Sequence, residues 1–267
     1  MRSMLKRYVH PPLLRLYRSI AAGVRFSGEY ATWEEALRNA TGYDAPKIVE
    51  RVTAAALKVK LGEATYERDS VLFNEIQYSW PVLAGLMWIA AQHNNRLNVV
   101  DFGGSLGSSY FQTRKFLDTL DDCRWCIVEQ KAFVAAGRKY FSDGRLRFYE
   151  SLDECATDRR ADAILLSSVI QYLPRPHEFL EDIMQRGFRF ILVDRSPFSV
   201  DRADRITVQN VPPSIYPASY PSWVLNLDNF KSHMNTAYDL IAEYDTADTV
   251  NTPDFFKGFL YRKKEAC

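Results

Sequence analysis

Residues 97–111, with the sequence LNVVDFGGSLGSSYF, combine an apolar run, a carboxylate and three glycines at the spacing of a ligand-binding turn. The apolar run predicts a buried parallel strand that ends at Asp101. The glycines give the backbone the freedom for a tight turn that a ligand can approach closely. Ser108 then begins a predicted helix, whose free backbone N–H groups suit an anionic or carboxylate-bearing ligand.

A second carboxylate follows the next apolar run. Residues 125–129, WCIVE, predict a strand that ends in Glu129, and Gln130 precedes the next predicted helix. An acid at the tip of the second strand, roughly twenty residues beyond a glycine turn, accepts hydrogen bonds from ribose hydroxyls. Taken alone, Glu129 would be a solvated carboxylate stabilised by the helix dipole. Its distance from the glycine turn favours ribose binding.

The order of the glycines separates two cofactor classes. The dinucleotide fingerprint Gly-x-Gly-x-x-Gly needs a glycine two positions after Gly103, where this chain has Ser105. The order Asp-x-Gly-x-Gly-x-Gly, with Ser105 in place of the middle glycine, resembles motif I of the class I S-adenosylmethionine-dependent methyltransferases. The resemblance implies S-adenosylmethionine as cofactor, with its methionine part wrapped by the loop and its amino group near Asp101. The cofactor site predicted in this way consists of Asp101, Gly103, Gly104, Ser105, Gly107, Glu129, Gln130, Ser151, Leu152 and Ser167.

Strands and helices alternate through the rest of the chain. Further strands are predicted at residues 146–149, 162–167 and 188–194, which gives a parallel sheet covered on both faces with right-handed crossovers. Residues 238–245 and 256–264 then predict an antiparallel pair. This is the α/β, Rossmann-like fold that the class I methyltransferase resemblance implies, a mostly parallel sheet with an antiparallel C-terminal hairpin. A dinucleotide dehydrogenase would more often continue with another crossover helix or a second domain.

Three segments are predicted. Residues 1–26 form a basic amphipathic segment, residues 27–94 a helical prelude, and residues 95–267 the methyltransferase domain with an insertion at residues 196–226. The chain has 267 residues, of which 47% are apolar, and this is enough for a sizeable core.

The charge distribution bears on partners and location. The net charge of +1 argues against a chain-wide nucleic-acid footprint, although residues 1–25 carry six basic residues and no acid. Apolar residues from Leu13 to Val24 recur at helical spacing opposite arginines, a pattern that suits either an anionic membrane surface or an ordinary helix packed on the domain. No stretch reaches membrane-spanning length and Arg15 and Arg18 interrupt the only signal-like run, so we expect a cytoplasmic protein. The oligomeric state is left open.

Two segments are predicted to bind the acceptor of the methyl group. Residues 64–80 mix polar and aromatic residues without a period, which predicts a lid or binding loop; a buried network of Glu67, Arg68 and Asp69 is the alternative. Residues 196–223 predict a proline-restrained aromatic loop for a sugar ring or another flat or amphipathic acceptor, with a packed surface excursion as the alternative. The predicted substrate-binding residues are Tyr78, Trp80, Tyr172, Arg195, Tyr216, Tyr220 and Trp223.

A narrower resemblance covers the chain from about residue 28 to the end of the insertion. The phrases ERDSVLF, YSWP, DFGGSLGSSYF, VEQ, SSVIQYL, DRSPF and ASYPSW together are similar to a bacterial family of methyltransferases found among surface-polysaccharide (O-antigen) biosynthesis genes. The resemblance implies methyl transfer to a glycan or nucleotide-linked sugar precursor.

An oxygen acceptor needs a base. Asp194 ends the fifth predicted strand beside Arg195, which we expect to keep it ionised and so make it a weak base but a good orienter. His177 has a suitable intrinsic pKa, but it lies at a helix start after two prolines, where a lone histidine is more often incidental. Tyr172 is a third, weaker candidate. Cys123 and Cys126 have C-x-x-C spacing without a second pair or a histidine cluster, so no metal site is predicted.

Two other functions stay open. An NAD(P)-dependent oxidoreductase is disfavoured by the glycine order, and a non-catalytic, membrane-associated scaffold of glycan assembly would use the basic N-terminal segment and the aromatic insertion.

Overall fold

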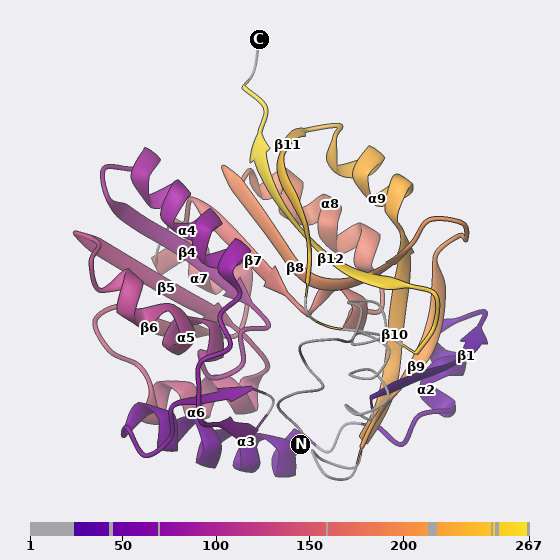
Figure 1. Cartoon of the computed structure of the whole chain (residues 1–267), viewed down its shortest axis with the longest axis horizontal. Helices are drawn as coiled ribbons and strands as arrows, with labels where there is room; N and C mark the ends of the chain where they lie inside the picture. The colour runs from indigo at the N-terminus through magenta and orange to yellow at the C-terminus, as the bar shows by residue number, and fades with distance from the viewer. Residues whose placement is uncertain are drawn as a thin grey trace, which may run out of the picture.

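A computed structural model of the chain describes residues 24–42, 45–68, 70–158, 160–212, 218–246, 248 and 251–265 (Figure 1). The predicted amphipathic segment up to residue 23, together with Asp69 and Tyr216, lies outside these residues. Within them, no helix has the length and apolar character needed to cross a membrane.

The segment that was predicted as a helical prelude contains helices and short strands. The predicted helices are present, and Thr32 caps the first of them by accepting a hydrogen bond from the Glu35 N–H at 3.1 Å. The strands β1, β2 and β3 were not predicted. In chain order the elements are β1 (Arg25–Tyr30), α2 (Trp33–Arg38), α3 (Ala45–Lys60), β2 (Tyr66–Arg68), β3 (Val71–Phe73) and α4 (Trp80–Gln92).

The predicted alternation of strands and helices follows. Its elements are β4 (Arg96–Phe102), α5 (Ser108–Leu117), β5 (Asp122–Val128), α6 (Lys131–Tyr140), β6 (Leu146–Tyr149), α7 (Leu152–Asp158), β7 (Ala163–Ser167), the 3₁₀ turn η2 (Ile170–Tyr172), α8 (Pro176–Arg186) and β8 (Phe190–Ser199). The last part of the chain contains β9 (Arg205–Val211), β10 (Ala218–Asn226), α9 (Leu227–Met234), β11 (Tyr238–Asp245) and β12 (Phe255–Lys263).

The central sheet has the predicted topology. Its parallel strands lie in the order β6-β5-β4-β7-β8, with Asp101 of β4 opposite Ile127 of β5 and Leu165 of β7. Strand β12 pairs antiparallel with β8, and β11 pairs antiparallel with β12 (Figure 1). The predicted fold class is confirmed, because this is the mostly parallel sheet with an antiparallel closing pair that the methyltransferase resemblance implies.

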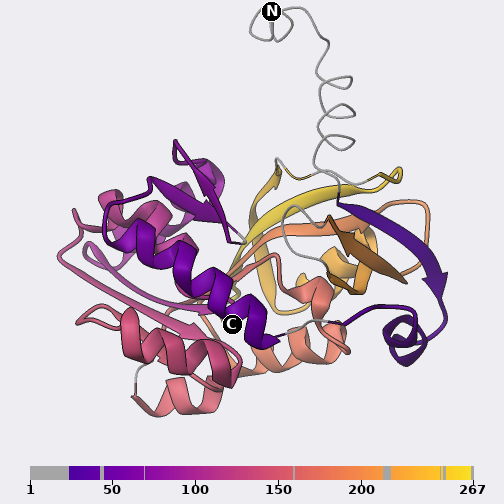
Figure 2. The same cartoon turned by 90° about the horizontal axis from the view of Figure 1, so that it is seen from below.

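The insertion after β8 is not the loop that was predicted. Strands β9 and β10 form an antiparallel hairpin, and β1 from the start of the chain pairs with β9. Figures 1 and 2 show β1 beside this hairpin, on the side of the molecule away from β6. The last two residues of β10 pair with Phe198 and Ser199 of β8, so this small sheet continues the large one. The prediction was wrong because the prolines of the insertion concealed two short runs of β-branched and aromatic residues.

Two apolar layers cover the central sheet. Alternation along β4 places Val99 against the cluster that contains α3 to α6, and Val100 against the cluster that contains α7 to α9. A smaller cluster packs α2 onto β9 through Ala36, Ile206 and Val208. The carboxyl edge of the sheet, where the parallel strands end, therefore lies between the β2–β3 hairpin and the β9–β10 hairpin.

Gly137 of α6 tests this packing. A Cβ atom at Gly137 would overlap the ring of Phe148 in β6, which is 2% exposed. Gly137→Ala in a helix interior would otherwise stabilise by about 1 kcal/mol. Overpacking against a buried ring reverses the sign, and we expect a loss of about 1–3 kcal/mol in the free energy of unfolding.

Chemical denaturation measures this change. Gly144→Ala is the matched control, since a Cβ atom there meets nothing within 4 Å, and it should stay within about 0.5 kcal/mol of the unsubstituted protein. A Gly137→Ala variant as stable as this control would contradict the described contact between α6 and β6.

Candidate functional site

A cleft of about 750 Å³ runs along the carboxyl edge of the sheet. It receives residues from the ends of β4, β5, β6 and β7 and from the β9–β10 hairpin. Of the ten predicted cofactor residues, the cleft is lined by Asp101, Gly103, Gly104, Ser105, Glu129, Gln130 and Ser167. The structure therefore brings together most of a site that the sequence spreads over more than sixty positions.

The glycine-rich loop after β4 has a conformation that its contacts require. Gly103 has φ +72° and Gly107, at the start of α5, has φ +100°. A Cβ atom at Gly103 would lie 2.6 Å from Cγ2 of Val169, and one at Gly104 would lie 2.5 Å from Cγ of Asp101. Ser105, which stands at the usual position of the middle glycine, keeps the left-handed φ of +55°. The loop thus adopts the expected turn in spite of that departure.

Asp101 lies beneath this loop. Its carboxyl group is 1% exposed, and Oδ2 accepts a hydrogen bond from Nε1 of Trp125 at 3.1 Å. Burial raises the pKa of Asp101 to about 7, because removing the carboxylate from water disfavours its charged form. Both the neutral and the ionised form of Asp101 are thus present near neutral pH.

Glu129 borders the same cleft from the tip of β5. Its carboxylate accepts a hydrogen bond from the backbone N–H of Gln130 at 2.5 Å. Burial is the largest effect and raises the pKa of Glu129. The backbone N–H of Gly103 donates to the carbonyl of Val128, the residue before Glu129, at 2.9 Å, so the two predicted cofactor elements are held together directly.

The end of β6 differs in detail from the prediction. Glu150 lines the cleft, whereas Ser151 caps α7 by accepting a hydrogen bond from the Glu154 N–H at 3.0 Å. Leu152 packs into the apolar core. The sequence signal for Glu150 was available, since it follows β6 just as Glu129 follows β5.

Asp194 lies near the carboxyl end of the parallel pairing of β8 with β7. It is 2% exposed and accepts hydrogen bonds from the hydroxyls of Ser167 at 2.9 Å and Tyr244 at 3.2 Å. Nε of Arg195 is 3.7 Å from its Oδ2. Arg195 lowers the pKa of Asp194 as expected, but burial has the larger effect and raises the pKa. A carboxylate with a raised pKa is a better base.

His177 is not brought to the cleft. Its Nε2 lies 2.5 Å from Oδ2 of Asp204, and this contact raises the pKa of His177. It lines neither this cleft nor the smaller cavity that adjoins it. This placement corresponds to the incidental histidine that the sequence analysis gave as the alternative.

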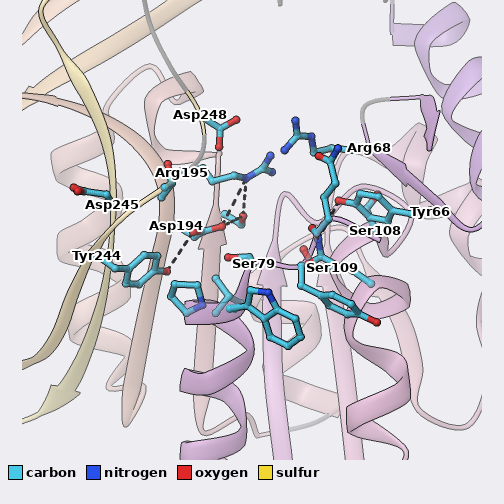
Figure 3. Close-up of a pocket in the computed structure, with 18 residues that line it drawn as sticks. Tyr66, Arg68, Ser79, Ser108, Ser109, Asp194, Arg195, Tyr244, Asp245 and Asp248 are labelled. Carbon is cyan, nitrogen blue, oxygen red and sulfur yellow. Dashed lines mark hydrogen bonds and ion pairs between the residues drawn. The ribbon is translucent and has the colours of Figure 1, made fainter. Parts of the chain in front are cut away.

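A second cavity, of about 260 Å³, adjoins the cleft (Figure 3). Tyr78 and Trp80 line it, with ring centroids 4.7 Å apart. The two cavities share the residues Arg68, Ser108, Ser109, Ser167 and Arg195.

Both interpretations of residues 64–80 are partly right. Glu67 is 3% exposed and accepts hydrogen bonds from the Ser108 hydroxyl and, at 3.3 Å, from the Ser70 N–H. This tethers the β2–β3 hairpin to the start of α5. The next residue, Arg68, lines both cavities. Glu67 is therefore structural, while Arg68 is a site residue that the sequence analysis did not select.

The wall of the cleft away from Glu129 is aromatic and polar. The Tyr172 hydroxyl donates to Oε1 of Gln209 at 2.9 Å, and Nε2 of Gln209 donates to the Tyr220 hydroxyl at 3.1 Å. All three residues line the cleft, as predicted for the two tyrosines. Trp223 instead stacks on Trp33, which lines the cleft in its place. Gln209 and Trp33 were missed because Gln209 reaches the cleft through the pairing of β9 with β10, and Trp33 through the packing of α2 on β9.

A buried glutamine holds the ends of β7 and β8 together. Nε2 of Gln171 donates to the Ser168 hydroxyl at 3.1 Å and to the Arg195 carbonyl at 3.3 Å. Ser168 and Arg195 have left-handed φ values of +54° and +50°. Such conformations cost energy in non-glycine residues and concentrate at functional sites. No sequence pattern indicated this role for Gln171.

The cysteines are placed in the core. Cys123, Cys126 and Cys155 are buried thiols, and burial raises the pKa of Cys123 to about 12. A thiol in this state is a poor nucleophile and metal ligand.

Comparison with known proteins gives structural neighbours only. No family model matches the chain, and no curated protein matches it. The N-terminal domain of EvdMO1, solved in the presence of SAH and D-fucose, is 14% identical, with 83% of this chain and 98% of that chain covered and a TM-score of 0.48. Magnesium protoporphyrin IX methyltransferase (ChlM) from Synechocystis PCC 6803 with bound SAM is 12% identical, with 84% and 99% covered and a TM-score of 0.46. We argue the chemistry from the residues of this chain.

The buried carboxyl of Asp101 makes stability depend on pH. Its pKa is about 7 in the folded protein against 3.8 for an ordinary aspartate, so the folded state retains a proton that the unfolded chain releases. The resulting stabilisation is complete below the unfolded pKa and is lost as pH rises through about 7. Asp101→Asn cannot ionise. We expect the stability of the unsubstituted protein relative to Asp101→Asn to fall by on the order of 2 kcal/mol between about pH 5 and about pH 8.

Denaturant unfolding of both proteins across this range measures the difference. Asparagine keeps an acceptor for Nε1 of Trp125, so the comparison isolates ionisation. A difference that does not change with pH would show that Asp101 titrates normally.

Proposed function

We propose that the protein is an S-adenosylmethionine-dependent methyltransferase that methylates an oxygen of a glycan or nucleotide-sugar precursor in surface-polysaccharide biosynthesis. One observation carries the methyltransferase part. Asp101 and Glu129, from neighbouring parallel strands, border one cleft with the glycine-rich loop between them. The glycine order of that loop fits motif I of this enzyme class and not the dinucleotide fingerprint.

The residues at the strand ends fit the parts of the donor in order. Glu129 suits the ribose hydroxyls, because a carboxylate accepts both of their hydrogen bonds. Glu150 lies one strand further along the edge, and we place the adenine on that side. The loop of Gly103 and Gly104 lets the backbone approach the methionine part. When bound, the donor supplies a methyl group on a sulfonium, so the protein has mainly to align the acceptor and exclude water.

Asp194 is the proposed base for an oxygen acceptor. Burial raises its pKa and so makes its carboxylate a stronger base, and Ser167 and Tyr244 donate hydrogen bonds to its two oxygens. The aromatic residues Tyr172 and Tyr220 on the opposite wall offer faces and hydroxyls to a sugar ring. The glycan assignment is supported by this wall and by the narrower sequence resemblance. We also propose a cytoplasmic location, with residues 1–25 as a peripheral membrane contact.

Glu129 gives the first test. Because it loses charge-assisted hydrogen bonds to the ribose, Glu129→Ala should raise the dissociation constant for S-adenosylhomocysteine about tenfold or more. Isothermal titration calorimetry measures this constant. Glu181→Gln, at an exposed position on α8, is the control and should bind normally.

The same titration separates the functional alternatives. Binding of NAD(P) in place of S-adenosylhomocysteine would favour the oxidoreductase. Binding of neither compound, together with liposome binding that is lost on deletion of residues 1–25, would favour the scaffold. Normal affinity in Glu129→Ala would remove Glu129 from the ribose role.

Asp194 gives a test of chemistry. We expect Asp194→Asn to bind S-adenosylhomocysteine within about threefold of the unsubstituted protein but to lower methyl transfer at least about a hundredfold, since an amide cannot accept the proton. Transfer of labelled methyl from S-adenosylmethionine to a panel of nucleotide sugars and glycan precursors provides the assay. Undiminished transfer by the variant would exclude Asp194 as the base.

A further inference from the structure

The strand ends change in chemical character along the edge of the sheet. Following the order β6-β5-β4-β7-β8, the chain presents Glu150, Glu129, the glycine-rich loop, Ser167 and then, on β8, Asp194 followed by Arg195. If the proposed donor occupies the first three positions, the acceptor must lie over the last two. The acceptor side of the edge therefore contains a cation, Arg195, beside the buried Asp194.

A second arginine approaches the same place from the β2–β3 hairpin. Arg68 and Arg195 both line the two cavities where these meet. Figure 3 shows their guanidinium groups directed toward one another across the smaller cavity. Like charges that face each other in a partly desolvated space repel, and an anion between them converts the repulsion into two charge-assisted attractions.

The backbone of each arginine is held in place by contacts of other residues. Arg68 follows Glu67, whose buried hydrogen bond to Ser108 fixes the hairpin against α5. The left-handed backbone of Arg195 is secured by Gln171, and Nε of Arg195 donates to the Ser167 hydroxyl at 3.4 Å. Such preorganisation lowers the entropic cost of binding a ligand.

The carboxylates of the smaller cavity have other roles. Asp194 accepts from Ser167 and Tyr244 and also lies 3.7 Å from Nε of Arg195, and Asp245 pairs with Lys257 at 3.2 Å. Asp248 lines this cavity. Its Oδ2 is buried and has no hydrogen-bond partner in the described part of the chain. A ligand hydroxyl would satisfy it. The cavity therefore suits a ligand in which an anionic group lies beside hydroxyls.

We propose that Arg68 and Arg195 bind a carboxylate or phosphate group of the methyl acceptor where the two cavities meet. This assignment rests on the proposed methyltransferase function, and it narrows the acceptor class to anionic sugars. The carboxylate of a sugar acid and the phosphate of a sugar phosphate or nucleotide sugar share this chemistry.

Calorimetric titration of the full chain with inorganic phosphate, D-glucuronate and D-glucose tests the proposal, at constant ionic strength and both with and without S-adenosylhomocysteine. We expect at least one anion to bind and neutral glucose not to bind. Tighter phosphate binding would identify a phosphorylated acceptor, and tighter glucuronate binding a sugar acid.

Arg68→Gln and Arg195→Gln should each weaken anion binding at least tenfold, and Arg195→Lys should weaken it less. Arg175→Gln, which alters an arginine 76% exposed and outside both cavity linings, should have no effect.

The donor's own carboxylate is the competing occupant. 5′-Methylthioadenosine lacks the amino-acid part of the donor, so its affinity reports only on the nucleoside end. We expect the ratio of the dissociation constants for S-adenosylhomocysteine and 5′-methylthioadenosine to be the same in Arg68→Gln, Arg195→Gln and the unsubstituted protein.

Three results would overturn the proposal. The first is that the unsubstituted protein binds no anion. The second is that Arg175→Gln loses as much affinity for the anion as Arg68→Gln and Arg195→Gln do. The third is that Arg68→Gln or Arg195→Gln loses affinity for S-adenosylhomocysteine alone. Failure of the proposed function would differ, because it would appear as absent binding of S-adenosylhomocysteine whatever the anions do.

Discussion

Parallel pairing of five strands brings five turns of the chain to one edge of the sheet, and the cleft depends on this constraint. Parallel strands need crossovers, so residues far apart in sequence, such as Asp101 of β4 and Asp194 of β8, end up at the same edge with only β7 between them. Where the neighbouring strands β4 and β5 end, the backbone N–H of Gly103 donates a hydrogen bond to the Val128 carbonyl at 2.9 Å. It couples the tip of β5 to the loop after β4, and it fixes the acid at the place where the proposed donor needs it.

Burial gives these side chains their chemistry. The carboxyl groups of Asp101, Glu129 and Asp194 all have raised pKa values, and in each case the largest cause is loss of hydration. Hydrogen bonds from Trp125, Gln130 and Ser167 limit that effect without cancelling it. The strand edge also stores backbone strain, because Ser105, Ser168 and Arg195 adopt left-handed conformations that glycine would adopt freely. Strain and desolvation thus occur together at one edge, as expected of a site built for a ligand.

The sequence predicted the part of the fold that is periodic and local. Apolar strands with intervening helices, the glycine turn and the acid of β5 can be recognised because each is a short pattern with one physical cause. The β9–β10 hairpin could not be recognised because prolines interrupt its two β-forming runs. The roles of Gln171 and Arg68 come from contacts between segments far apart in sequence, those of Gln171 with Arg195 and of Glu67 with Ser108. His177 shows the converse, since a suitable intrinsic pKa says nothing about position, and Asp204 holds it away from the cleft. The sign of the pKa shift of Asp194 needed burial, which an adjacent arginine in the sequence does not reveal.

The most direct measurement is a crystal structure of the protein with S-adenosylhomocysteine. The account predicts the nucleoside between the glycine-rich loop and the tip of β5, with both ribose hydroxyls about 2.5–3.0 Å from the carboxylate oxygens of Glu129 and the sulfur facing Ser167 and Asp194. The ligand bound elsewhere, or bound in this cleft without contact to Glu129, would contradict it.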